Sequence, residues 1–336
     1  MMTRQRLITS YLVLTGLLGL SILLSLSMGY ARSSFLDVID LILGQSSSAM
    51  TFIMTTIRLP RIIACLFGGA SLAISGMLLQ TLTKNPLADS GILGINTGAG
   101  FMIALVIGYL NITSASAISL LPFMAMLGGI ATIATVYLMA RKKNHGISPT
   151  RLIVTGVGVS TMLSGVMVSI TSTLSPDKMD YIISFLSGKV SGATWENISL
   201  FAPIFVLLWI ITYSRSRYLN IMALNEQTAL ALGLDLKRER LITIILSTTL
   251  AALSVVMIGN ITFVGLVAGH ITRRFMGGDH RIILPFGMMT GMILLLVADT
   301  IGRVLLVGSG IPTGLIVSCI GAPYFLWLMS KTKENS

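Results

Sequence analysis

Acidic side chains within apolar stretches are the residues of this sequence that could bind a proton or a metal cation. The chain contains twelve Asp and Glu residues, and all except Asp299 fall in expected loops or at the edges of apolar stretches. Asp299 precedes Arg303 by four residues, a spacing that predicts an ordinary ion pair on one helix face. Because ion-coupled carriers place acids at membrane depth, the sequence offers no site for a coupling ion.

Motifs for nucleotide binding, hydrolysis and metal binding are absent from the sequence. The one Gly-Lys pair, Gly188-Lys189, precedes Val190 and does not form a phosphate-binding loop. His270 and His280 lie ten residues apart on either side of a basic turn, and neither HExxH nor GxSxG occurs. We therefore expect no enzyme activity, no metal site and no cofactor in this chain. Moving a two-state equilibrium from 1:99 to 99:1 takes about 5.5 kcal/mol of differential binding, and a partner must supply it.

One polar stretch, residues 223–236 (ALNEQTALALGLDL), has the pattern of a short helix that could receive such a partner. Asn225 predicts an N-cap, Glu226 suits the positive end of a helix, and Gly233 predicts its end. The apolar surface between the caps comes from three residues: Ala229, Leu230 and Leu232. A helix of about eight residues is marginal alone in water. It must therefore pack on its own membrane domain, on a partner or on the lipid surface.

The composition places most of the chain in a membrane. Hydrophobic residues make up 54% of the 336 residues and charged residues 10%, whereas a soluble domain has about 25% charged residues. Cys65 and Cys319 lie in apolar tracts, which indicates buried thiols and no disulfide. The apolar run that follows Arg4 and Arg6 is too long for a signal peptide, so we interpret it as the first membrane span.

Apolar runs separated by charged residues, Pro and Gly predict an all-α polytopic protein with ten spans. Their expected limits are 7–29, 60–82, 91–110, 116–140, 151–172, 196–213, 241–258, 261–275, 282–302 and 313–330. The span 261–275 is short enough to be bent or partial. In the fifth span, Gly156, Ser160 and Ser164 recur every four residues. Such a stripe of small residues packs closely on a neighbour or lines a polar path.

The distribution of basic residues predicts that both termini are cytoplasmic. With the N-terminus inside, 17 of the 23 Lys and Arg residues fall on the cytoplasmic side, as the positive-inside rule requires. The six on the outer side are Arg32, Arg58, Arg61, Lys178, Lys189 and Arg303. This asymmetry explains the net charge of +11 without a nucleic-acid partner.

Four segments carry a resemblance to a known family. They are RLPRIIACLFGGASLAISGMLLQTLTKNPLADSGILGINTGAG (58–100), GNITFVGLVAGHITRRFMGGDHRIILP (259–285), ADTIGR (298–303) and GAPYFLWLM (321–329). In order and spacing they resemble the FecCD-type permeases of ABC importers for iron siderophores and cobalamin, over nearly the whole chain. The resemblance implies the type II ABC importer permease fold, with residues 1–336 as a single transmembrane permease domain in the bacterial cytoplasmic membrane.

The resemblance also implies the partners. They are a second permease subunit, identical or paralogous, two ATPase subunits that bind ATP, an extracytoplasmic solute-binding protein, and membrane lipid. The expected ligand is a ferric siderophore, and haem or cobalamin is the alternative within the same class. An ion-coupled secondary carrier is the alternative from a different class. The generic small and apolar residues of the spans do not select among these ligands.

Three sets of site residues follow from matching the family motifs. The helix Asn225 to Gly233, with Glu226, Ala229, Leu230 and Leu232, is implied to seat in a cleft of the ATPase. The arginines implied to meet glutamates of the binding protein are Arg58, Arg61 and Arg303, although snorkelling to lipid headgroups explains them too. The residues implied to form a cytoplasmic gate are Asn85, Leu87, Ser148 and Thr150, which ordinary turn chemistry explains nearly as well.

Two positions depart from the family pattern. Gly269 precedes His270 where the family usually has Pro, which leaves the local helix break to glycine. Gly310 precedes Ile311-Pro312 where the family usually has an acid. The second departure removes the basis for an acidic contact in that outer loop.

Overall fold

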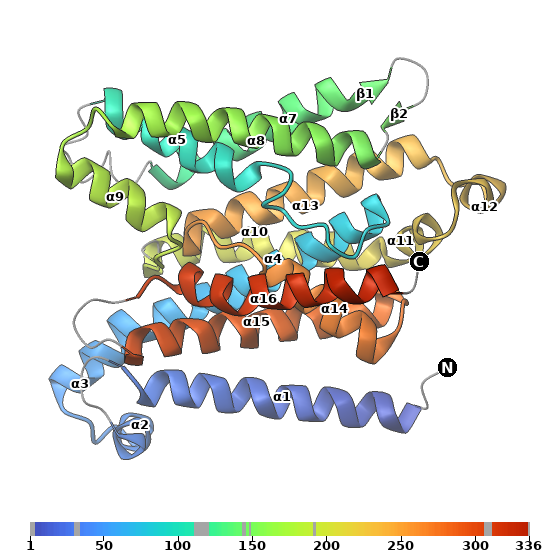
Figure 1. Cartoon of the computed structure of the whole chain (residues 1–336). Helices are drawn as coiled ribbons and strands as arrows, with labels where there is room; N and C mark the ends of the chain where they lie inside the picture. Colours follow the sequence, from blue (N-terminus) through green and yellow to red (C-terminus); the bar gives the residue numbers. More distant parts are fainter. Residues whose placement is uncertain are drawn as a thin grey trace.

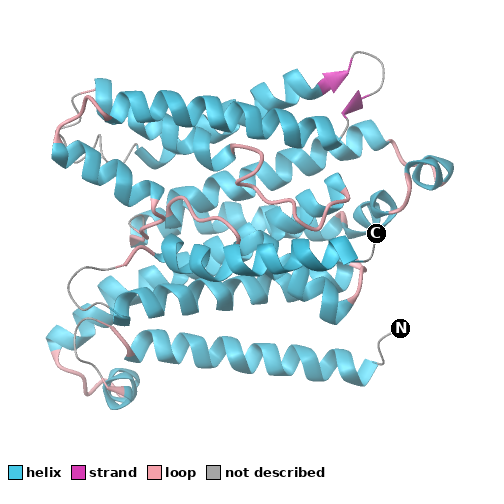
Figure 2. Ribbon diagram, in the orientation of Figure 1, coloured by secondary structure: helices cyan, strands magenta, loops and turns pink. Residues whose placement is uncertain are grey.

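The computed structural model of the chain describes residues 4–29, 34–110, 121–142, 146–147, 149–190, 193–305 and 311–334. Long helices lie side by side in a bundle (Figures 1 and 2). Each of the ten predicted spans corresponds to one helix: α1 (Arg4–Ser27), α4 (Leu59–Thr83), α5 (Ile95–Tyr109), α7 (Leu121–Ala140), α8 (Pro149–Thr171), α10 (Trp195–Ser214), α13 (Leu236–Ile258), α14 (Val264–Met276), α15 (His280–Leu305) and α16 (Thr313–Glu334).

Eight helices in the described part of the chain are long and apolar enough to cross a membrane. The two shorter members of the bundle are α5, with 15 residues, and α14, with 13. At 1.5 Å per residue, α14 covers about 20 Å, less than the ~30 Å of a hydrocarbon core. The prediction that the span 261–275 is partial is therefore confirmed.

Shorter elements close the two ends of the bundle. One end carries α11 (Ser216–Ala223), α12 (Glu226–Ala231) and the antiparallel pair β1 (Arg141–Lys142) and β2 (Gly146–Ile147). The other end carries α2 (Phe35–Ile42), α3 (Ser48–Phe52), the π-helical η1 (Ile53–Arg58) and α9 (Pro176–Leu186). Figure 1 shows both ends of the chain at the α12 end, as an even number of spans requires.

The centre of the bundle is α4, which glycines bring close to its neighbours. A Cβ added at Gly76 would lie 2.5 Å from the Cα of Gly265 in α14, and one added at Gly69 would lie 2.4 Å from the carbonyl oxygen of Gly291 in α15. Lipid tails give helices no hydrophobic reason to associate, so close van der Waals contact between small residues holds such helices together. Larger residues at these four positions would separate α4 from α14 and α15.

The small residues of α8 serve the same purpose at two of their three positions. Gly156 lies where a Cβ would meet the Ile92 carbonyl oxygen at 2.9 Å, and a Cβ at Gly94 would meet the Ser160 hydroxyl at 2.6 Å. Of the two interpretations of this stripe, helix packing therefore accounts for Gly156 and Ser160. The packing fixes α8 against the turn that precedes α5.

Candidate functional site

The polar stretch 223–236 forms the short helix α12 between two caps. The Asn225 side chain accepts a hydrogen bond from the Thr228 backbone N–H at 2.7 Å. At the other end Gly233 has a φ of +80°, a left-handed conformation that glycine adopts without steric cost. The Gly233 N–H donates to the Leu230 carbonyl at 2.9 Å. Both sequence-predicted caps are thus present in the structure.

Two of the three apolar residues predicted for the α12 surface are exposed. Leu230 and Leu232 are 59% and 58% exposed, whereas Ala229 is fully buried. Ala229 belongs to the same apolar cluster as Met222 and Leu234 of this chain. The expectation that Ala229 offers a surface to a partner is therefore wrong. Its small side chain instead lets α12 pack closely on its own subunit.

Charged side chains tie α12 to two long helices. Glu226 forms an ion pair with Arg240, near the start of α13. The hydrogen bond from Arg240, together with its charge, holds the pKa of Glu226 below its ordinary value. Lys84, the C-cap of α4, donates a hydrogen bond to the Leu224 carbonyl just before α12. These contacts connect the α12 segment directly to α13 and to the end of α4.

A buried set of hydrogen bonds joins α11, the helix before α12, to α4. His280 is fully buried, and its ring nitrogens lie 2.7 Å from Thr81 Oγ1 of α4 and 2.7 Å from Asn220 Oδ1 of α11. His270 instead contacts the ring of Tyr324 edge-on, with ring centroids 5.7 Å apart. The two histidines thus have separate structural partners. Among the described residues no group of three His, Cys, Asp or Glu side chains could hold a metal ion.

The loop that follows α4 contains two of the predicted gate residues, Asn85 and Leu87. Asn85 Oδ1 accepts a hydrogen bond from the Leu87 N–H at 2.9 Å, which makes an Asx turn. Leu87 is half-buried and packs in one apolar cluster with Leu266 of α14 and Leu328 of α16. Because the turn directly follows Lys84, the contact with the α12 segment and the predicted gate are adjacent in the chain.

The other two predicted gate residues, Ser148 and Thr150, belong to the start of α8. Thr150 is exposed in the first turn of the helix, and Ser148 lies outside the described residues. Farther along α8, a Cβ at Gly156 would lie 3.0 Å from the Cα of Leu93, at the end of the loop that holds Asn85. The helix α8, which has Thr150 in its first turn, therefore packs on this loop through Gly156.

The same loop carries a carboxylate into the interior of the bundle. Asp89 is 6% exposed, and its Oδ2 accepts a hydrogen bond from the Phe263 N–H at 3.2 Å, just before α14. Phe263 has a φ of +69°, an uncommon conformation for a bulky residue that concentrates at functional sites. Figure 1 shows the chain between α4 and α5 running back into the bundle. The prediction that Asp89 lies in a loop is correct, but the loop folds inward.

A cavity of about 380 Å³ lies beside Asp89. The α4–α5 loop, the start of α5, the segment between α13 and α14, and Phe325 of α16 line it. Within the described residues, the side-chain oxygens of Asn96 and Asn260, which line it, have no hydrogen-bond partner. A buried unsatisfied group costs about 1–3 kcal/mol. A polar ligand or water in this cavity would remove that cost, which makes the cavity a candidate part of a translocation path.

Two of the three predicted docking arginines pair with one buried acid at the opposite end of the bundle. Asp299 is fully buried and pairs with Arg61 at 2.8 Å and with Arg303 at 3.0 Å. Thr313 Oγ1 donates a further hydrogen bond to Asp299 at 2.8 Å. The ion pair predicted between Asp299 and Arg303 is therefore confirmed. The side chains of Arg61 and Arg303 remain 25% and 13% exposed.

Arg58 lies deeper than the sequence predicts. It is only 4% exposed and donates a hydrogen bond to the Leu26 carbonyl at the C-terminal end of α1. Arg303 reaches the same end of α1 through Ser25 Oγ at 2.6 Å. This burial argues against the predicted role of Arg58 in meeting the binding protein. The π-helical turn η1 ends at Arg58 and joins α4 directly, and the sequence pattern gives no sign of that turn.

These features define a polytopic membrane permease. Long apolar helices form a bundle, the capped helix α12 protrudes at one end (Figure 1), and Asp89, Asn96 and Asn260 line a cavity between the helices. The chain belongs to the FecCD transport family, whose model matches residues 17–331.

Similar proteins span the same length. The chain is 37% identical to the iron(3+)-hydroxamate import system permease protein FhuG of Bacillus subtilis, covering 92% of each chain. It is 33% identical to the hemin transport system permease protein HmuU of Yersinia pestis over 321 residues, which cover 94% of this chain and 95% of HmuU. A solved inward-facing metal-chelate type ABC transporter matches with a TM-score of 0.81 and 31% identity, covering 97% of this chain and 99% of that one. The chain is therefore a permease subunit of an ABC transporter.

Proposed function

We propose that this chain is the transmembrane subunit of an ATP-driven importer for ferric siderophores. In this proposal a second permease subunit, identical or paralogous, completes the path, and two ATPase subunits bind at the α12 end. An extracytoplasmic solute-binding protein delivers the ligand at the other end. Both termini face the cytoplasm of a bacterial cell. Iron-hydroxamate import by the relative with 37% identity favours a siderophore, and the hemin permease with 33% identity keeps haem as the second candidate.

The geometry of α12 is the single observation that carries the proposal. A helix of six residues has little stability of its own in water, yet this one is capped at both ends and presents Leu230 and Leu232 outward. Exposed apolar residues on a rigid, capped element are what a protein partner needs for a packed contact. In the proposal, the ATPase is the partner that supplies the free energy for switching the transporter between its two states.

The contacts behind α12 suggest how that energy reaches the ligand path. ATP-driven movement of α12 acts on the end of α4 through Lys84 and through the buried His280. The next residues are the turn of Asn85 and Leu87, and then Asp89 at the cavity. In the proposal, this loop opens and closes the cytoplasmic end of the path, with Ser148 and Thr150 of the α8 region on its other side.

At the opposite end, Arg61 and Arg303 are the residues we assign to the binding protein. Their guanidinium groups are partly exposed, so acidic side chains of a docked protein can reach them. Arg58 is buried and is assigned to holding the end of α1. Exposed charge pairs contribute about 0.2–1 kcal/mol each, so these contacts mainly guide docking and raise its rate.

Uptake by proteoliposomes tests the proposal. Vesicles containing the permease and its ATPase subunits, with ATP on the ATPase side, should accumulate a ⁵⁵Fe-labelled hydroxamate siderophore when the binding protein is added outside. An ATPase variant without hydrolysis should abolish accumulation. Uptake that persists without ATP and collapses with an uncoupler would instead identify an ion-coupled carrier. Uptake of haem but not of the siderophore would move the substrate to the second candidate.

A further inference from the structure

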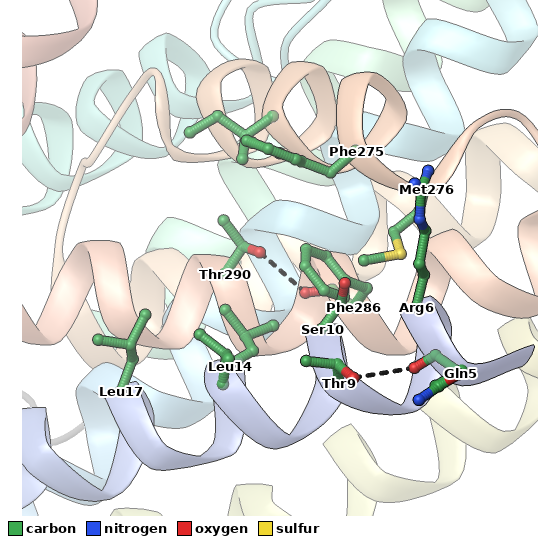
Figure 3. Close-up of a pocket in the computed structure, with 12 residues that line it drawn as sticks. Gln5, Arg6, Thr9, Ser10, Leu14, Leu17, Phe275, Met276, Phe286 and Thr290 are labelled. Carbon is green, nitrogen blue, oxygen red and sulfur yellow. Dashed lines mark hydrogen bonds between the residues drawn. The ribbon is translucent and has the colours of Figure 1, made fainter. Parts of the chain in front are cut away.

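A groove of about 720 Å³ lies between α1, α14 and α15 at the end of the bundle that holds the N-terminus (Figure 3). This volume lies within the range of about 300–1,000 Å³ that small-molecule sites occupy. The walls include Val13 and Leu17 of α1 and Phe275 of α14, which are 56%, 48% and 64% exposed. Only four of the 24 residues of α1 are buried. Protein side chains thus leave much of this side of α1 uncovered.

The groove changes from polar to apolar along α1. On α1 its polar residues, Gln5, Arg6, Thr9 and Ser10, come from the first turns of the helix, and Val13 and Leu17 follow toward the centre of the bundle. On α15 the Thr290 hydroxyl donates its hydrogen bond to the Phe286 carbonyl of its own helix. At 1.5 Å per residue, residues 5 to 17 cover about 18 Å. One leaflet supplies half of a hydrocarbon core of ~30 Å, so the groove has the depth and the polarity of one leaflet.

A cationic group stands at the polar mouth. Figure 3 shows Arg6 extending from α1 beside Met276, across the end of the groove. Arg6 is exposed, and no ion pair joins it to another residue in the described part of the chain. The Thr9 hydroxyl already donates to the Gln5 carbonyl at 2.9 Å. The charge that can select an occupant is therefore that of Arg6.

We propose that this groove binds one anionic glycerophospholipid from the leaflet that faces the N-terminus of α1. The lipid phosphate pairs with Arg6, the ester region lies at the level of Ser10, and an acyl chain lies against Val13, Leu17 and Phe275. The bound lipid completes the packing of α1 on α14 and α15. This inference is independent of the transported ligand and of the ATPase.

Native mass spectrometry of the full-length chain in detergent tests the site. The chain is titrated separately with dioleoylphosphatidylglycerol and dioleoylphosphatidylcholine, which share their acyl chains and differ in head-group charge. One basic residue near an anionic membrane surface contributes about 1 kcal/mol, so the first bound phosphatidylglycerol should be favoured about fivefold. Arg6→Gln should remove this preference. The matched control Arg4→Gln makes the same charge change outside the groove lining and should keep it.

A second variant covers the case in which Arg6→Gln alters the fold. Ser10→Trp fills the groove and should reduce binding of both lipids while the lipid-free melting temperature stays unchanged. Equal loss of preference in Arg4→Gln and Arg6→Gln would attribute the effect to general surface charge and overturn the proposal. So would a wild-type chain without preference. Disulfide cross-linking of Leu17→Cys between two copies would also overturn it, because a second copy would then occupy the groove.

Discussion

Replacing Leu230 by Asp is the sharpest test of the proposed ATPase contact. Leu230 is 59% exposed, so docking can still bury more than half of its side chain. Fully burying a Leu side chain contributes about 1.5–3 kcal/mol, and the exposed share therefore about 1–2 kcal/mol. Because 1.4 kcal/mol is tenfold in affinity, Leu230→Asp should weaken ATPase binding about 5- to 30-fold. Desolvation of the new carboxylate adds to this loss.

The assay is the affinity of the purified ATPase subunits for the full-length permease in nanodiscs, followed by uptake in proteoliposomes. Leu43→Asp is the matched control, because Leu43 is 63% exposed and follows α2 at the opposite end of the bundle. It should leave ATPase affinity unchanged. Ala229→Asp should instead lower the melting temperature of the permease itself, since it buries a charge. Wild-type affinity and wild-type uptake in Leu230→Asp would refute the assignment of α12 to the ATPase.

The remaining contacts predict three more outcomes. Asp299→Asn leaves two mostly buried arginines without their counter-charge, so the free energy of unfolding should fall by about 3–5 kcal/mol; an unchanged melting curve would contradict this. Lys84→Met should reduce uptake but not ATPase affinity, and equal loss of both would place Lys84 in the docking surface. The lowered pKa of Glu226 means that its pair with Arg240 stabilises α12 above the ordinary carboxyl range and is lost as pH falls through the folded pKa. Proteolysis of α12 should therefore increase as pH falls below the ordinary carboxyl pKa, and Glu226→Gln should remove that dependence on pH.

The number and order of the spans could be predicted from the sequence because each depends on local composition. A run of about 20 apolar residues has few alternatives to a membrane helix, and charges beside it locate its ends. The caps at Asn225 and Gly233 are equally local, since each depends on one side chain and the backbone next to it. The spans and the two caps are therefore predictable, because each is determined by residues that are close together in the sequence.

Burial and long-range pairing could not be predicted in the same way. Ala229 and Leu230 are neighbours of similar character, and only the tertiary packing of α12 buries one and exposes the other. Asp89 looks like a surface loop residue in the sequence, because its buried position is fixed by a hydrogen bond to the backbone of Phe263, which is 174 residues away. A Phe at position 263 gives no signal of its positive φ, since glycine is the residue expected there.

The relative strengths of the contacts behind α12 indicate which of them transmit force. Exposed ion pairs contribute about 0.2–1 kcal/mol, and the Glu226 side chain in the pair with Arg240 is 56% exposed. Such a pair cannot by itself pass on the about 5.5 kcal/mol needed to move a gate from 1:99 to 99:1. The buried contacts are stronger candidates, because His280 bonds both α4 and α11 within the core and Ala229 packs α12 onto the same core. If the proposed function is correct, α11, α12 and the end of α4 therefore move as one rigid unit, and the hinge lies beyond Lys84, in the loop that leads to Asp89.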